Sequence, residues 1–338
     1  MPVADLLETL SHRHLDQAES YRTFEMLLSG CFSEVEITAV LVALKTRGES
    51  ADEIAGAAMA LRDAARPFPK PPGPVADTCG TGGDRSGTIN ISTAAAFVAA
   101  AGGVPVAKHG NRATTSRCGS ADLIEALGIP LDLAPSLARR ALDDAGICFL
   151  FAPAYHAGVR LASAVRQTLK TRTVFNRLGP LANPARPEIQ LMGIYAAGLC
   201  RSTALTLGRL GCRSALVVHG GGLDELALHH HSEATLLQDG NLTDLILTPE
   251  DAGLPRYPVS ALLAEGGPAD AAVWLRELLA GRAPDAHLAA VALNAGALFW
   301  IAGVAPDLRS GVNVAREILG RGTATATLER LIEASHGT

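Results

Sequence analysis

The sequence predicts an α/β protein with a smaller all-α domain, in which a central, mostly parallel sheet is flanked by helices. Residues 1–66 show helical patterns only, and the proline-rich segment 67–74 ends them because proline cannot continue a helix. From residue 75 onward, short apolar runs alternate with longer helical segments, which is typical of a parallel sheet covered by helices. We therefore expect a helical domain at 1–66, a hinge at 67–74 and an α/β domain at 75–338.

Two capping boxes predict helix starts in the N-terminal domain. Ser33 with Glu36, and Ser50 with Glu53, have the spacing in which the hydroxyl accepts a free backbone N–H and the carboxylate reaches back to the cap. Each pair opens an amphipathic segment. We expect one helix after Ser33 and another after Ser50.

The strands are expected at the apolar runs VPVA (104–107), ICFLF (147–151) and SALVVHG (214–220). Residues 155–185 interrupt the alternation with a helix and a loop punctuated by Gly and Pro. Residues 268–336 are almost wholly helical in pattern. No internal repeat is found along the chain.

The composition is that of a protein with a sizeable core, because 48% of its 338 residues are hydrophobic and 19% are charged. No apolar run approaches the roughly 20 residues of a membrane span, and the N-terminus lacks a secretion-signal pattern, so we expect a cytoplasmic protein with no membrane partner. Six scattered cysteines without a C-x-x-C pair predict reduced thiols. The net charge of −5 and the lack of a dense Lys/Arg tract argue against nucleic acid and favour a small-molecule partner.

A glycine-rich stretch, DTCGTGGDRSGTINIST at 77–93, follows the short run 75–77 and precedes Ser92, the expected N-cap of the next helix. Glycines in such a turn allow positive φ and let backbone N–H groups approach a phosphate or pyrophosphate. The spacing matches neither the P-loop nor the G-x-G-x-x-G pattern. A tight turn without a ligand is the alternative interpretation.

A second polar cluster, AKHGNRATTSRCGSAD at 107–122, repeats the strand-to-helix position of the first. Ligands of α/β sheets collect at the carboxyl ends of strands, where both loops are expected. Lys108 in this loop is a candidate cation for phosphate charge. The alternative is an exposed loop of ordinary polar residues.

Two further groups carry candidate charges. Arg166 shares a helical segment with Arg160 and Lys170 and suits a planar carboxylate, although a solvated basic face is the common alternative. Asp224 and Glu225 follow a strand in a glycine-flanked turn, from which carboxylate oxygens reach Mg²⁺, although adjacent acids are usually solvated surface. The run His229–His231 is expected to be a surface loop rather than a metal site.

Taken together, the motifs GTGGD with TINIST, KHGNR, GSAD, FNRLGPLANP and GLDE resemble the anthranilate phosphoribosyltransferases of tryptophan biosynthesis in order and approximate spacing, nearly from end to end. The resemblance implies a small helical domain, completed by part of 155–185, and an α/β domain related to the pyrimidine nucleoside phosphorylases. It also implies a homodimer through the helical domains and an active site between the two domains.

The same resemblance implies Mg²⁺-dependent transfer of phosphoribosyl from 5-phosphoribosyl-1-pyrophosphate to the amine of anthranilate, with two Mg²⁺ ions and no catalytic general base. The residues expected at phosphoribosyl pyrophosphate are Gly80, Thr81, Gly82, Gly83, Asp84, Thr88, Asn90, Ser92, Thr93, Lys108, Thr115 and Ser120. Those expected at anthranilate are Gly80, His109, Asn111, His156, Arg166 and Pro180. The expected metal ligands are Ser92, Asp224 and Glu225.

Three departures from the family pattern stand out. The family usually has a proline and then a larger residue at 157–159, where this chain has Ala-Gly-Val, which predicts a wider acceptor site. Lys170 replaces a usual glycine, and Gly221 stands where an acid is common. The alternatives are transfer to a substituted anthranilate or another aromatic amine, a nucleoside phosphorylase, and a non-catalytic nucleic-acid-binding relative.

Overall fold

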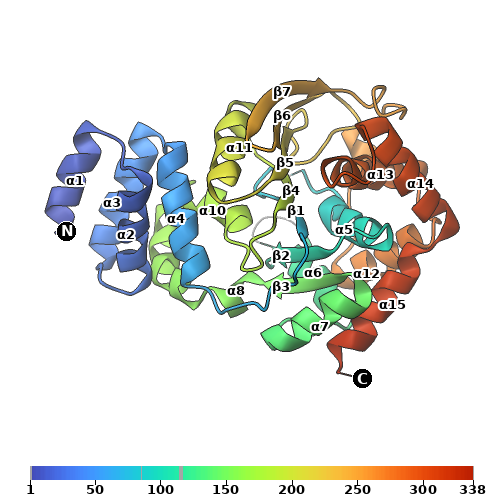
Figure 1. The fold of residues 1–338 in the computed structure, drawn as a ribbon, viewed down its shortest axis with the longest axis horizontal. Helices are drawn as coiled ribbons and strands as arrows, with labels where there is room; N and C mark the ends of the chain where they lie inside the picture. The colour runs from blue at the N-terminus through green and yellow to red at the C-terminus, as the bar shows by residue number, and fades with distance from the viewer. Residues whose placement is uncertain (1, 85, 114–116, 338) are drawn as a thin grey trace.

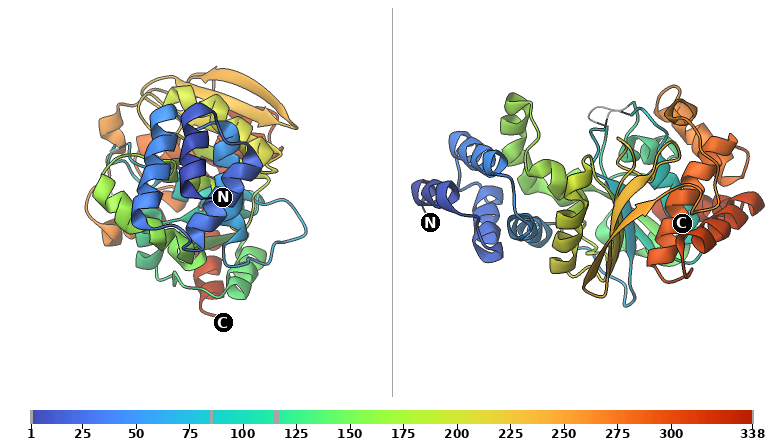
Figure 2. Two further views of the ribbon diagram at one scale, coloured as in Figure 1. Left: turned by 90° about the vertical axis from the view of Figure 1, so that its left-hand side faces the viewer. Right: turned by 90° about the horizontal axis from the view of Figure 1, so that it is seen from above.

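The computed structural model describes residues 2–84, 86–113 and 117–337. A seven-stranded sheet lies at the centre of its larger part, and a group of N-terminal helices projects from one side (Figure 1). Seen from above, the N-terminal helices, an inner helix layer, the sheet and the C-terminal helices follow one another across the molecule (Figure 2). This arrangement confirms the predicted α/β fold with a smaller helical part. Among the described residues, no helix is long and apolar enough to cross a membrane.

The strand order is β3-β2-β1-β4-β5-β6-β7. Five strands are parallel: β1 (Ala76–Gly80), β2 (Val106–Gly110), β3 (Ile147–Phe151), β4 (Ile189–Gly193) and β5 (Ser214–His219). Because β1 lies between β2 and β4, the connections leaving its two sides diverge there, and the carboxyl ends of these strands form a crevice. The fold thus provides the place where the polar loops meet.

The sheet ends in an antiparallel hairpin that the sequence analysis did not predict, formed by β6 (Ser232–Gln238) and β7 (Asn241–Leu247). Asp239 and Gly240 join these strands with φ values of +46° and +84°. An Asp-Gly pair with positive φ at both positions is the signature of a tight hairpin turn. The local signal was therefore present in the sequence.

Helices cover both faces of the sheet. On one face lie α5 (Ile91–Ala101), α13 (Asp285–Ile301) and α14 (Leu308–Arg321), and on the other lie α10 (Phe175–Leu181) and α11 (Cys200–Arg209) (Figure 1). Successive side chains of β5 point to opposite faces of the sheet. Leu216 and Val218 belong to one apolar cluster, whereas Ala215 and Val217 belong to a second. The remaining helices of the larger part are α6 (Ser120–Ala126), α7 (Pro135–Ala145), α12 (Pro268–Leu279) and α15 (Ala324–Ser335).

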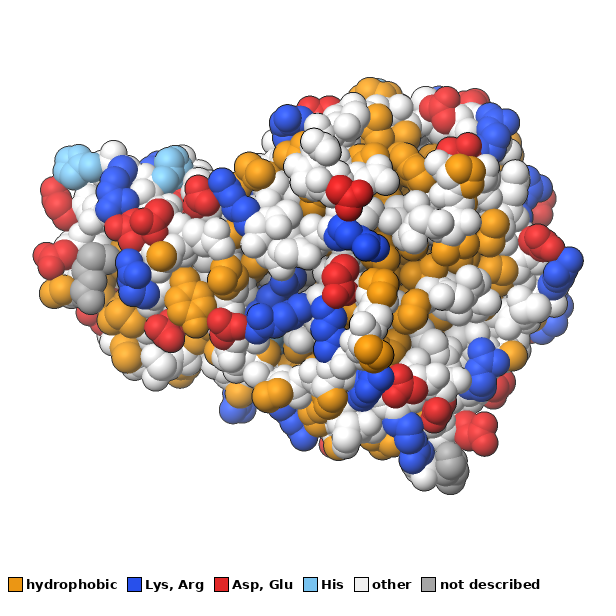
Figure 3. Space-filling model, viewed as in Figure 1, with side chains coloured by type: hydrophobic (Ala, Val, Ile, Leu, Met, Phe, Trp, Pro, Cys, Tyr) orange, Lys and Arg blue, Asp and Glu red, His pale blue; other side chains and the backbone are white. Residues whose placement is uncertain are grey.

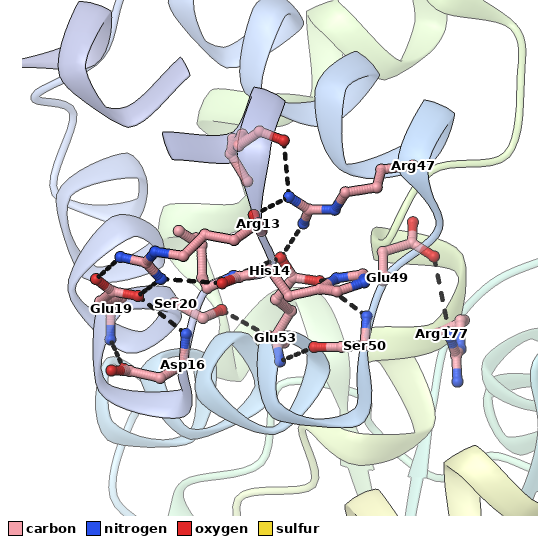
Figure 4. A network of polar contacts seen from close by, with 12 residues as sticks. Arg13, His14, Asp16, Glu19, Ser20, Arg47, Glu49, Ser50, Glu53 and Arg177 are labelled. Carbon is pink, nitrogen blue, oxygen red and sulfur yellow. Dashed lines mark hydrogen bonds and ion pairs between the residues drawn. The ribbon is translucent and has the colours of Figure 1, made fainter. Parts of the chain in front are cut away.

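The N-terminal helices are α1 (Val3–His12), α2 (Gln17–Leu28), α3 (Glu34–Arg47) and α4 (Ala51–Asp63). Both predicted capping boxes are confirmed, at Ser33 and at Ser50. The carboxylate of Glu53 is buried and accepts hydrogen bonds from the backbone N–H groups of Leu15 and Ser50. It also forms an ion pair with Arg47 (Figure 4). Burial raises the pKa of Glu53, but these backbone N–H donors outweigh it and hold the pKa below its usual value.

The segment after β3 packs on these N-terminal helices. It contains α8 (Ala152–Tyr155), a 3-10 helix at Ala157–Ala162, α9 (Ser163–Leu169) and then α10. Val165 and Leu178 share an apolar cluster with Phe24 and Leu41, and the rings of Phe24 and Phe175 lie 6.1 Å apart. This packing supports the joining of part of 155–185 to the helical domain, while the division of the chain at 67–74 stays a prediction.

Candidate active site

One cavity of about 530 Å³ lies at the carboxyl ends of β1 and β2, bounded by α9, α10 and the turn after β5. It is lined by every predicted site residue that the structure describes: Gly80, Thr81, Gly82, Gly83, Asp84, Thr88, Asn90, Ser92, Thr93, Lys108, His109, Asn111, Ser120, His156, Arg166, Pro180, Asp224 and Glu225. Thr115, also predicted, lies outside the described residues. Tertiary structure thus brings together motifs that are far apart in the chain.

Residues 80–84, here called the glycine loop, form one wall of the cavity. Gly82 and Gly83 have φ values of +68° and +77°, a conformation that favours glycine. A Cβ atom on Gly80 would overlap the carboxylate of Asp224. Thr81 fastens the loop to the end of β4, because its N–H donates to Gly193 O at 3.0 Å and its Oγ1 accepts the N–H of Tyr195 at 3.1 Å. The loop is therefore a held turn with a backbone that ligands can approach.

Beneath this loop lie Asp224, which is buried, and Glu225, which is half-buried. Burial and the charge of Asp84 raise the pKa of Asp224 to about 7, and burial and the charge of Asp224 raise the pKa of Glu225 to about 8. Buried carboxyls that repel one another fit a bound cation, and their hard oxygen atoms suit Mg²⁺. Within the described ranges, no cluster of three or more His, Cys, Asp or Glu has metal-binding geometry. A Mg²⁺ ion here would need water or substrate oxygens as well.

The helix after the glycine-rich stretch begins earlier than predicted. Its N-cap is Asn90 rather than Ser92, and Ser92 lies in the first turn of α5. From this position the backbone N–H of Ser92 lowers the pKa of Glu225 against the effect of burial. The N-terminus of α5 is therefore directed at the buried acids, as the dipole of a helix favours.

Lys108 does not lie in a loop, which corrects the sequence-based expectation. Strand β2 continues through Lys108 and His109 because both pair with β3, so the Lys108 side chain is only 2% exposed. Its Nζ donates to Thr78 O at 2.6 Å and to Ser92 Oγ at 3.5 Å. Lys108 therefore supports the cavity from the sheet, with its charge beside the buried acids.

Asp77 and Asn183, which were not predicted as site residues, support the same region. Asp77 is fully buried in β1, and Asn183 Nδ2 donates to its Oδ2 at 2.9 Å and to Ala107 O at 2.8 Å. One amide thus ties the segment after α10 to both β1 and β2. The asparagine was visible in the motif FNRLGPLANP, but its partner, 106 residues away, was not.

Two buried histidines form the opposite end of the cavity. The rings of His109 and His156 meet edge to face with centroids 5.3 Å apart. Burial lowers the pKa of His109 to about 3 and that of His156 to about 4, so both are neutral at pH 7. Among the described residues, neither Nε2 atom has a hydrogen-bond partner. This end of the cavity therefore offers neutral rings with free polar atoms.

Arg166, on α9, lines the cavity with its guanidinium carbon 5.3 Å from the ring centroid of Phe175. Burial lowers its pKa. No Asp or Glu in the described part of the chain forms an ion pair with it. A half-buried, stacked guanidinium of this kind is suited to a planar carboxylate on a ligand.

Most of the altered segment 157–159 lies away from the cavity wall. Only Val159 of the three residues lines the cavity. A Cβ atom on Gly158 would extend toward α2, 2.8 Å from Leu28 O. The glycine therefore permits close packing of the 3-10 helix on α2, and its small size does not widen the cavity.

The three consecutive histidines lie beside the turn after β5. His229 Nε2 and Gly221 O are 3.0 Å apart, and a Cβ atom on Gly221, which has φ +55°, would lie 2.7 Å from His230 Cβ. Glycine at position 221 therefore lets the segment His229–His231 pack closely on this turn, where a residue with a side chain would meet His230.

Comparison with known proteins identifies the class. The chain matches the helical bundle domain of a glycosyl transferase family at residues 5–65 and the a/b domain of that family at residues 72–325. The protein is therefore a glycosyltransferase in which a helical bundle precedes an α/β domain.

Individual relatives narrow this class. The chain is 54% identical to the anthranilate phosphoribosyltransferase of Sorangium cellulosum over 95% of its own length and 92% of the relative's. It is 46% identical to the anthranilate phosphoribosyltransferase of Pseudoalteromonas translucida, over 98% of this chain and 93% of the relative. The crystal structure of the Thermus thermophilus enzyme superposes with a TM-score of 0.93 at 44% identity, covering 99% of this chain and 100% of that one. The Saccharomyces cerevisiae enzyme in complex with PRPP and Mg gives 0.87 at 27% identity, covering 99% and 98%.

The chain belongs to the anthranilate phosphoribosyltransferase family. It is a pentosyltransferase of tryptophan biosynthesis, which transfers a phosphoribosyl group from phosphoribosyl pyrophosphate to the amine of anthranilate. The resemblance drawn from the sequence motifs is confirmed. These relatives favour that activity over the nucleoside phosphorylase and nucleic-acid-binding alternatives.

Proposed function

We propose that the cavity binds both substrates side by side, with phosphoribosyl pyrophosphate at the glycine loop and anthranilate between His109, His156 and Arg166. The observation that carries this proposal is the difference in polarity between the two ends of this cavity. Its glycine-loop end has backbone N–H groups and buried acids, while its other end has neutral rings and one guanidinium. A pyrophosphate with a cation suits the first end, and an aromatic carboxylate suits the second.

Mg²⁺ fits the glycine-loop end, with Asp224 and Glu225 holding one ion and Ser92 lying near a second. The buried oxygen donors and their raised pKa values support this assignment. The yeast relative was solved in complex with PRPP and Mg, which supports it independently. Bound Mg²⁺ would neutralise the charge that develops on the departing pyrophosphate.

The residues of the chain then contribute mainly by positioning. The bond from the anomeric carbon of ribose to the pyrophosphate oxygen breaks, ribose gains oxocarbenium character, and the amine of anthranilate attacks from the opposite face. The glycine loop, whose Thr81 and Gly82 N–H groups donate within the protein, positions the departing pyrophosphate, and Arg166 orients the acceptor through its carboxylate. Histidines with pKa values of about 3 and 4 are weak bases, which supports a mechanism in which the amine loses its proton late.

Assembly as a homodimer through the N-terminal helices is part of the same proposal. On α3, Val35 is 79% exposed and Val42 is 40% exposed. Apolar side chains gather on the helical part of the surface (Figure 3). A dimer would remove them from water. A cytoplasmic location also fits, because phosphorylated substrates do not cross membranes freely. Sedimentation equilibrium tests the dimer, and a purely monomeric protein at micromolar concentration would reject it.

The activity is tested by following the fluorescence of anthranilate after the enzyme is mixed with Mg²⁺ and phosphoribosyl pyrophosphate. We expect a decay that EDTA abolishes and that excess Mg²⁺ restores. A panel of substituted aminobenzoates under the same conditions tests the acceptor, and anthranilate is expected to react with the highest kcat/KM. Binding of phosphoribosyl pyrophosphate without any decay would mean that the acceptor half of the proposal is wrong.

A further inference from the structure

The segment 170–172 connects α9, which carries Arg166, to the start of α10, and it reaches the glycine loop. Arg172 donates from its guanidinium to Gly83 O at 2.9 Å. The guanidinium carbon also lies 4.1 Å from the ring centroid of Tyr195. Arg172 therefore holds a carbonyl of the glycine loop while it is itself stacked on an aromatic ring.

The platform under Arg172 is fixed to the same loop. The backbone N–H of Tyr195 donates to Thr81 Oγ1, and Thr81 N–H donates to Gly193 O. The loop is thus held at Thr81 from β4 and at Gly83 from Arg172. Gly82 and Gly83 have positive φ values. An unrestrained glycine segment would readily adopt other backbone conformations.

The other side of the segment is fixed to the N-terminal helices. Lys45 Nζ, on α3, donates a hydrogen bond to Thr171 Oγ1. Lys170 turns the chain at the end of α9 with φ +47° and ψ +30°. Arg172 therefore extends toward the glycine loop from a backbone that is anchored immediately before it.

We propose that Arg172 is a positioning residue that holds the glycine loop in its ligand-binding conformation before the substrate arrives. The inference rests on the proposed role of this loop in binding phosphoribosyl pyrophosphate. Arg172 acts through Gly83, so its loss affects donor binding through the cost of ordering the loop.

The decisive variant is Arg172→Gln, studied in the full-length protein with hydrogen exchange and steady-state kinetics. Without substrate or Mg²⁺, we expect faster amide exchange at residues 81–84. We expect the KM for phosphoribosyl pyrophosphate to rise about tenfold, which corresponds to about 1.4 kcal/mol, while the KM for anthranilate changes little. Arg172→Lys keeps the charge without the planar fork and is expected to behave like Arg172→Gln.

Variants of Tyr195 test the same interaction from the side of the aromatic ring. Tyr195→Leu removes the ring under Arg172 and is expected to raise the same KM, whereas Tyr195→Phe keeps the ring and is expected to stay closer to wild type. Combining Tyr195→Leu with Arg172→Gln is expected to add little, because both remove one interaction. Arg316→Gln, which removes one exposed arginine on α14, is the matched control.

Unchanged exchange at residues 81–84 in Arg172→Gln would overturn the inference. A second variant, Asp84→Asn, separates this failure from that of the proposed function. If Asp84→Asn raises the KM for phosphoribosyl pyrophosphate and Arg172→Gln does not, the inference about Arg172 is wrong while the donor site stands. If neither variant changes that KM, the proposed donor site is itself wrong.

Discussion

The backbone N–H of Gly82 donates a 2.6 Å hydrogen bond to Oδ2 of Asp224, a residue 142 positions further along the chain. This bond joins the loop after β1 to the turn after β5 across the crevice of the sheet. The two elements proposed to bind pyrophosphate and Mg²⁺ are therefore held in contact by the protein itself. A change in either partner should affect the other.

Asp224→Asn tests this link. We expect kcat/KM for phosphoribosyl pyrophosphate to fall on the order of 100-fold, because a ligand of the proposed cation is neutralised. We expect the Tm without Mg²⁺ to be unchanged or higher, since burial and Asp84 disfavour the charged form of Asp224. Steady-state kinetics with phosphoribosyl pyrophosphate over a series of Mg²⁺ concentrations measure the first effect. Asp132→Asn, on the surface, is the control, and equal Mg²⁺ dependence in both variants would contradict the assignment.

Arg166→Ala tests the acceptor end. We expect the KM for anthranilate to rise about tenfold or more, because a charge-assisted pair with the carboxylate is worth about 1.5–3 kcal/mol. The KM for phosphoribosyl pyrophosphate should change little. The KM of Arg166→Lys for anthranilate should lie between those of wild type and Arg166→Ala, since lysine keeps the charge but not the planar geometry. Unchanged acceptor kinetics in Arg166→Ala would show that the assigned role is wrong.

The neutral histidine pair predicts a loss of stability in mild acid. The unfolded chain takes up protons at these histidines near pH 6.5, whereas in the folded protein their pKa values are about 3 and 4, because burial opposes the charge and Lys108 and Arg62 add to the effect at His109. The unfolded state thus binds more protons between those limits, so stability falls as the pH decreases. At about 1.4 kcal/mol per pKa unit, His156 alone contributes roughly 3 kcal/mol between pH 6.5 and pH 4.

His156→Asn should therefore flatten the decrease in the free energy of unfolding between pH 6.5 and pH 4. Urea unfolding at several pH values measures this slope. The matched control is His12→Asn, which changes an exposed histidine on α1 and should leave the slope nearly as in wild type. Equal slopes in wild type and His156→Asn would contradict the buried, neutral state of His156.

Lys170→Gly tests a strained position. Lys170 adopts the left-handed conformation, which costs a residue with a Cβ atom about 1 kcal/mol. Glycine removes this strain but adds entropy to the unfolded chain, so we expect a net gain of about 0.5 kcal/mol or less. Lys170→Ala keeps the strain and serves as the control in thermal unfolding. A lower Tm for Lys170→Gly than for Lys170→Ala would contradict the expectation.

Local sequence signals were sufficient for much of the fold. The run ICFLF coincides with β3, and the capping pairs at Ser33 and Ser50 begin helices as predicted. The predicted site residues that the structure describes all line one cavity. The motifs GTGGD and GLDE meet there because each follows a parallel strand, and the carboxyl ends of such strands share one edge. The hairpin of β6 and β7 was missed although Asp239 and Gly240 marked its turn.

Errors arose where a residue's surroundings, rather than its neighbours in sequence, decide its state. Lys108 was expected in a loop, but pairing of β2 with β3 buries it. The segment 157–159 was expected to shape the cavity, yet its Gly158 lies against Leu28 instead. Neither partner can be identified from one sequence, because many distant segments satisfy the same local pattern.

The sequence by itself determined the division into a helical part and an α/β part, the positions of several helices and strands, and the family, since these depend on periodicity, turn chemistry and motif spacing. Only the tertiary structure decided that His109 and His156 are neutral, that Asp224 and Glu225 hold protons more tightly than usual, and that Arg172 holds Gly83. The physical reason is that desolvation and charge pairing depend on which atoms surround a group, and packing alone sets those surroundings.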